Sequence, residues 1–126
     1  MNNWSRNYLV SNKLVNTYRK LFQDSHPLHT SDKKAKQMGF KMRLVYGNIL
    51  GGFISNFVGM VLGTHETFLI QQQIVYLKPV YVNDNLSLHV ELYKFFPSVN
   101  TIEYKFQFYN QHNIIIARGT FQCISK

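Results

Sequence analysis

Hydrophobic and polar residues alternate along much of the second half of the chain, and this pattern predicts β-strands. The clearest alternation runs over residues 86–93 and again over 102–109, where every second side chain is apolar. Such a strand buries one face and leaves the other in solvent. Residues 68–77 and 114–124 are rich in β-branched and aromatic residues and predict two further strands, with Gly119 expected at a bulge. Proline, asparagine and aspartate mark the turns between them at 79–84, 97–98 and 110–113.

The first part of the chain has a helical spacing of apolar residues. A short strand is expected at residues 8–10, and Ser11 can then cap a helix that runs through Phe22. The apolar side chains of that helix fall on one face: Leu14, Val15, Tyr18, Leu21 and Phe22. Thr30 or Ser31 can cap a second, short helix that ends near Gly39.

Residues 44–64 form the longest stretch without a charged side chain, LVYGNILGGFISNFVGMVLGT. Such a stretch is long enough to cross a bilayer, but it can equally form the buried central helix of a soluble domain. Asn48, Ser55 and Asn56 would be costly in lipid, and the strands that follow need an apolar element to pack on. We therefore expect a buried helix and no membrane span.

Length and cysteine content place the chain in a broad class. A chain of 126 residues predicts one domain, spanning 1–126, with enough apolar and aromatic content for a packed core. The single cysteine, Cys123, permits no internal disulfide and has no basic neighbour in sequence, so we expect it to be buried and unreactive. The first residues lack the apolar core of a signal peptide. These features favour a cytoplasmic protein.

The chain is strongly basic, with 14 lysines and arginines against six acidic residues. This excess favours an anionic partner. Nucleic acid is not expected, because the basic residues are scattered and no known nucleic-acid-binding motif is present. A phosphate-bearing small molecule, an acidic carrier protein and a merely solvated surface all fit the same charge.

The densest group of chemically capable side chains lies between the two predicted helices, at Gln23-Asp24-Ser25-His26-Pro27-Leu28-His29. Pro27 keeps His26 extended and ends any helix before it. Asp24 and His29 then lie at the two ends of one tight loop, where a carboxylate and an imidazole can orient a water molecule and take its proton. In isolation, such a pair is more often a turn cap and a surface histidine.

The loop and its surroundings resemble a known family. Asp24-x-His26-Pro27-Leu28-His29, followed by five residues and Ala35, is similar to the signature of MaoC-like (R)-specific enoyl-CoA hydratases. The similarity continues in order through residues 39–40, 44–47 and 77–84 and covers nearly the whole chain. It implies an α+β hotdog fold, in which an antiparallel sheet wraps around one long central helix, and it implies a homodimer.

The resemblance also implies a site. Asp24 and His29 would hold and activate water, and the backbone N–H of Gly47 would bind the thioester carbonyl, a role that a helix N-terminus favours electrostatically. Tyr46, Ser55 and His26 would lie near the substrate. The chain departs from the family where His26 replaces an asparagine, Tyr46 a histidine and Gln23 a glycine. Tyr46 can shape the pocket or bond to substrate without transferring protons.

The expected function is addition of water to a trans-2-enoyl thioester, or its removal from an (R)-3-hydroxyacyl thioester. The substrate would be carried by coenzyme A or by an acyl carrier protein, and the reaction needs no cofactor. No metal is expected, because His65, His89 and His112 lack ligand spacing. Two alternatives stay open on the same fold. A thioesterase would need a base on the central helix, where residues 44–64 offer none, and a non-catalytic acyl-thioester-binding module would explain the replaced residues.

Overall fold

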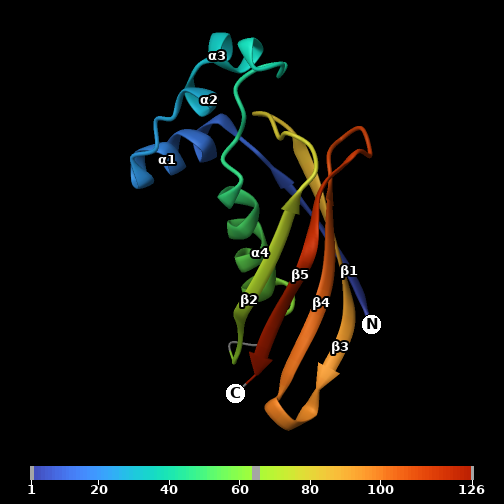
Figure 1. The fold of residues 1–126 in the computed structure, drawn as a ribbon. Coiled ribbons are helices and arrows are strands. Elements are labelled where there is room, and N and C mark those ends of the chain that lie inside the picture. The colour runs from blue at the N-terminus through green and yellow to red at the C-terminus, as the bar shows by residue number, and fades with distance from the viewer. Residues whose placement is uncertain (1, 64–65, 126) are drawn as a thin grey trace.

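The fold is a five-stranded antiparallel sheet that curls against one central helix (Figure 1). The computed structural model describes residues 2–63 and 66–125. The strand order across the sheet is β1-β3-β4-β5-β2. Along the chain the elements are β1 (Asn3–Leu9), α1 (Asn12–Phe22), α2 (Pro27–Thr30), α3 (Asp32–Gln37), α4 (Asn48–Met60), β2 (Thr67–Tyr76), β3 (Asn85–Phe96), a 3-10 turn (Pro97–Val99), β4 (Thr101–Tyr109) and β5 (Ile115–Ser125).

The core lies between α4 and the inner face of the sheet. In β3 the alternating residues Leu86, Leu88 and Val90 are buried, and Leu88 and Val90 pair with Phe108 and Phe106 of β4. The apolar residues of α4 cover this face, with Ile54 and Phe57 fully buried. Strands β3 and β4 therefore each bury one of their two faces, as the alternation predicts. The expected α+β hotdog architecture is confirmed.

The central helix is shorter than the uncharged stretch that contains it. Helix α4 begins at Asn48, with Gly47 in the N-cap position, and ends at Met60. The residues before α4 are not helical and instead hydrogen-bond to two other segments of the chain. The Leu44 N–H donates to the Leu28 carbonyl and the Val45 N–H to the Val80 carbonyl, both at 2.8 Å. Among the residues described, no helix is long and apolar enough to cross a membrane.

Helices α1, α2 and α3 form a helical lobe, residues 12–43, at the N-terminal end of α4 (Figure 1). As predicted, Ser11 caps α1 by accepting the Leu14 N–H at 3.1 Å, and Ser31 caps α3 by accepting the Lys34 N–H at 3.2 Å. The four-residue helix α2 was not predicted; Pro27 occupies its first turn, where the missing N–H has no cost.

Two expectations about local structure are wrong. Gly119 is not at a bulge, because the sheet irregularities of the described strands occur between residues 69 and 71, 92 and 94, and 108 and 109. Position 119 needs a glycine for another reason: a Cβ atom on residue 119 would lie 1.8 Å from the Gln73 carbonyl oxygen of β2. The first strand is also longer than expected. It begins at Asn3 because hydrogen bonding to β3 continues toward the N-terminus beyond the apolar residues that predicted it.

The histidines outside the predicted site and the single cysteine were not expected to bind a metal. His65 falls outside the residues described, while His89 and His112 are exposed. Residues 2–63 and 66–125 contain no group of three potential metal ligands. Cys123 is buried on β5, as expected, and burial raises the pKa of its thiol to about 11.

Candidate active site

A cavity of about 240 Å³ lies at the N-terminus of α4, beneath the helical lobe. It brings together four of the six residues predicted for the site, although they come from separate segments of the chain. The residues that line it are Tyr18, Asp24, His29, Tyr46, Gly47, Asn48 and Tyr76.

A larger hollow, of about 510 Å³, lies on the sheet face opposite α4. Polar strand residues such as His89, Lys105 and Arg118 line it, and none of the predicted site residues does. Because it lacks a paired acid and base next to a helix N-terminus, we place the candidate site in the smaller cavity.

The loop that carries Asp24 is held by its own hydrogen bonds. Helix α1 ends at Gln23 in the left-handed conformation (φ 53°), a conformation in which glycine is more usual. Asp24 Oδ1 then accepts the His26 N–H at 3.2 Å, and His26 Nδ1 accepts the Leu28 N–H at 3.1 Å. His26 therefore caps α2 and shapes the loop, and it does not line the cavity.

His29 is fixed in one tautomer by the chain that enters α4. Its Nδ1 lies 2.8 Å from the Leu44 carbonyl oxygen. A carbonyl can only accept, so Nδ1 carries the proton and, in the neutral ring, Nε2 is left as a proton acceptor. His29 is half-buried and lines the cavity. An imidazole held in this way can act as a base.

Tyr46 joins the other members of the site. Its buried ring packs against the His29 ring at 4.2 Å and the Tyr18 ring at 4.6 Å between centroids. Its hydroxyl donates to the backbone carbonyl oxygen of Asp24. Burial, and then the nearby Asp24 charge, raise the pKa of Tyr46, while Arg19 opposes this. The phenol thus stays protonated and ties the Asp24 loop to the start of α4.

The backbone at Gly47 is available to a ligand. The Gly47 carbonyl accepts the Leu50 N–H at 3.0 Å, but its own N–H donates to no residue in the part of the chain described. Free N–H groups at a helix N-terminus favour negative charge. A Cβ at Gly47 would lie 3.0 Å from Tyr76 Cζ, so glycine also lets the Tyr76 ring approach. Burial raises the pKa of Tyr76, with a smaller contribution from Tyr18.

Ser55 is the other predicted residue outside the cavity. It lies two turns beyond Gly47 on α4 and is exposed. Three further residues line the cavity and were not predicted from the sequence: Tyr18, Asn48 and Tyr76. Tyr18 carried a partial signal, since the helical pattern put it on the buried face of α1; nothing in its own neighbourhood marks Tyr76, which reaches the site from the end of β2.

Comparisons with known proteins show what the chain as a whole is similar to. The chain resembles the (R)-hydratase of A. caviae involved in PHA biosynthesis, with a TM-score of 0.88 and 18% identity over 98% of this chain and 94% of that one. The R-hydratase PhaJ1 from Pseudomonas aeruginosa gives a TM-score of 0.86 and 20% identity, with 98% and 79% covered. The HadBC complex from Mycobacterium tuberculosis, named a 3R-hydroxyacyl-ACP dehydratase, gives 0.73 and 15%, with 97% and 94% covered.

At these identities the structural matches establish the fold alone. No curated protein sequence matches the chain significantly. The family model described as "MaoC like domain" matches residues 4–106, which is most of the chain. The chain therefore belongs to the MaoC-like domain family.

Proposed function

We propose that this protein hydrates a trans-2-enoyl thioester, or dehydrates the corresponding (R)-3-hydroxyacyl thioester. The observation that carries the proposal is the placement of Asp24 and His29 on one cavity, next to the free N–H of Gly47. The names of the similar structures, an (R)-hydratase and a 3R-hydroxyacyl-ACP dehydratase, support the same reaction class.

In the proposed reaction Asp24 and His29 hold a water molecule against Cβ of the substrate. His29 Nε2 is the free acceptor for the water proton, because Nδ1 is committed to the Leu44 carbonyl. As the water proton passes to His29 Nε2, the oxygen of water forms a bond to Cβ and the Cα=Cβ π-electrons move toward the thioester carbonyl. These electrons then return to Cα, which takes up that proton. The Gly47 N–H stabilises the enolate-like oxygen. The thioester itself acidifies Cα, so the reaction needs no cofactor.

Substitution of Asp24 and of His29 tests this proposal. Asp24→Asn and His29→Ala should each lower kcat by about 10²–10⁴, the usual contribution of a positioned acid or base. Turnover of trans-2-butenoyl thioesters on coenzyme A and on carrier protein is followed by loss of the conjugated-thioester absorbance. His112→Ala is the matched control, because His112 lies in an exposed turn away from the cavity. Equal losses in His29→Ala and His112→Ala would count against the assignment.

The second candidate function is a non-catalytic acyl-thioester-binding module. Tyr46 and His26, which replace the family's usual histidine and asparagine, favour it. Wild-type protein that binds the thioester but turns over neither form would establish the binding module instead. A thioesterase is less well supported, because helix α4 carries no carboxylate that could serve as its base.

A further inference from the structure

Although the basic residues looked scattered along the sequence, positive charge is concentrated in the helical lobe. Residues 12–43 hold eight of the 14 basic residues and two of the six acidic ones, so about a quarter of the chain carries six of the eight net positive charges. Fields of one sign gathered on one part of a surface steer partners of the opposite sign.

The lysines of the lobe are exposed and lack acidic partners. Six of them face solvent: Lys13, Lys20, Lys33, Lys34, Lys36 and Lys41. Of the two acids in the lobe, Asp32 accepts from Arg43, with the side chains 3.5 Å apart, and Asp24 accepts the His26 N–H. The Arg43–Asp32 pair is the only salt bridge found within residues 2–63 and 66–125. The lysine charges are therefore free to meet a partner.

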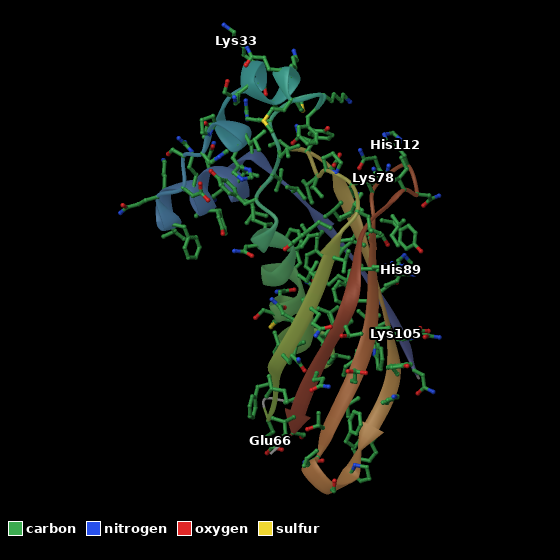
Figure 2. All side chains as sticks on the ribbon, viewed as in Figure 1. Lys33, Glu66, Lys78, His89, Lys105 and His112 are labelled. Carbon is green, nitrogen blue, oxygen red and sulfur yellow. The ribbon has the colours of Figure 1, made fainter. Side chains whose placement is uncertain are left out.

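The helical lobe that carries the lysines also supplies part of the candidate site. Tyr18, Asp24 and His29 belong to the lobe and line the cavity, and Arg19 lies near enough to influence the pKa of Tyr46. The Lys41 N–H donates to the Tyr81 hydroxyl at 3.3 Å and so joins the lobe to the segment that bears Lys78. Figure 2 shows Lys33 and Lys78 toward this end of the molecule and Glu66 at the other end.

The spread of the charges favours a macromolecule over a single phosphate group. A phosphate is recognised by donors that converge on one point, whereas these lysines lie on α1, on α3 and on the loop that follows. Apolar side chains are exposed among them: Leu21 at 73%, Phe22 at 67% and Met38 at 52%. Apolar anchors within a charged rim are characteristic of protein–protein interfaces.

We infer that the helical lobe is the docking surface for an acidic carrier protein that presents the acyl thioester to the cavity. The inference rests on the proposed function, since it names the carrier of the same substrate. It predicts that the protein partner contributes to substrate recognition, in addition to the thioester that enters the cavity.

Charge reversal on α3 tests the docking surface. The double variant Lys33→Glu/Lys36→Glu reverses two charges on the lobe, and Lys94→Glu/Arg118→Glu makes the same change in net charge on strands outside it.

The substrates used as probes are trans-2-butenoyl thioesters of an acidic acyl carrier protein, of coenzyme A and of pantetheine, which lacks both protein and phosphate. For the carrier-protein substrate, the α3 variant should lose about tenfold or more in kcat/KM. Added salt should lower the wild-type value in the same way. The strand variant should retain its kcat/KM, and the pantetheine thioester should be turned over equally by all three proteins.

Three results would overturn the inference. Equal losses in the α3 and strand variants would show that only net charge matters. Wild-type turnover of the coenzyme A thioester as efficient as that of the carrier-protein thioester, with the same loss in the α3 variant, would assign the lobe to phosphate groups. Binding of the wild type, but not of the α3 variant, to anionic phospholipid vesicles without binding to the carrier protein would assign it to a membrane surface.

Two further measurements show whether a negative result is due to a misfolded variant or to a wrong proposed function, instead of to the absence of docking. Circular dichroism checks the α3 variant, and Lys33→Gln/Lys36→Gln replaces it if the helix is lost, because glutamine and lysine have similar helix propensities. If the wild type turns over no thioester, the proposed function fails. Titration of labelled carrier protein with the wild type and the α3 variant then still decides whether the lobe binds it.

Discussion

Tyr46 shows how one side chain connects the parts of the candidate site. It packs against the rings of His29 and Tyr18, and its hydroxyl bonds to the backbone of Asp24. The sequence predicts that Tyr46 lies at the site, because it precedes Gly47 at the start of an uncharged helix. Its bond to Asp24, 22 residues away, could not be predicted, because that contact depends on how α1 packs beside α4.

Replacing this phenol should separate its positioning role from proton transfer. Tyr46→Phe removes a hydrogen bond to a backbone carbonyl, and the free energy of unfolding should fall by about 1 kcal/mol. KM should change more than kcat, because a phenol whose pKa is raised does not exchange protons near neutral pH. Urea denaturation and steady-state kinetics measure the two effects.

A matched tyrosine outside the cavity gives the control for this prediction. Tyr109→Phe also removes a hydroxyl donor, to Gln107 on the strand, and should leave both kinetic constants unchanged. A fall in kcat for Tyr46→Phe as large as that for Asp24→Asn would instead place the phenol in the chemical step.

At the scale of elements, the strands and helix caps could be predicted and the packing distances could not. Alternation locates β3 and β4 because burial of one face imposes a period of two. Ser11 and Ser31 are found because capping is a local interaction. The absence of charged residues over 44–64 indicates burial but does not distinguish helix from other buried structure, so this stretch is longer than α4 itself. Gly119 was expected at a bulge because a glycine within a strand often marks one. The real reason for the glycine is the close approach of β2, which residues next to Gly119 in the sequence do not indicate.

The contact at Gly119 predicts a large difference between two glycine substitutions. In Gly119→Ala the new methyl group would meet the Gln73 carbonyl at 1.8 Å, so β2 and β5 must move apart. We expect a loss of about 1–3 kcal/mol or more in the free energy of unfolding, the usual cost of overpacking.

Gly52 on α4 provides the control for Gly119. A Cβ at Gly52 would meet nothing within 4 Å, and alanine in a helix is favoured over glycine by about 0.5–1 kcal/mol. Gly52→Ala should therefore leave stability unchanged or raise it in a chemical denaturation experiment. Equal destabilisation by the two substitutions would contradict the close approach of β2 to β5.

At the scale of the whole molecule, apolar side chains stay exposed on parts of the sheet that α4 does not cover. The aromatic residues of β4 are not among them, because Tyr104, Phe106 and Phe108 are buried under α4. Exposed apolar side chains lie along β2, among them Phe68 and Ile70, and along the second half of β3. Since β2 is an outer strand of the sheet, its outer edge can accept another strand.

We predict that two copies associate through the β2 edge to form a homodimer. A twofold axis would set β2 of one chain against β2 of the other and cover the same residues in both. Ile70 is 48% exposed on β2, and Ile70→Lys should shift the protein to a monomer, because a lysine facing its symmetry mate adds charge repulsion to lost apolar contact. Leu9→Lys, on the opposite edge strand β1 and 58% exposed in the wild type, should leave the dimer intact. Gel filtration with light scattering at micromolar concentration distinguishes these states. A wild-type monomer that keeps its activity would exclude the dimer, and dissociation by Leu9→Lys alone would move the interface to β1.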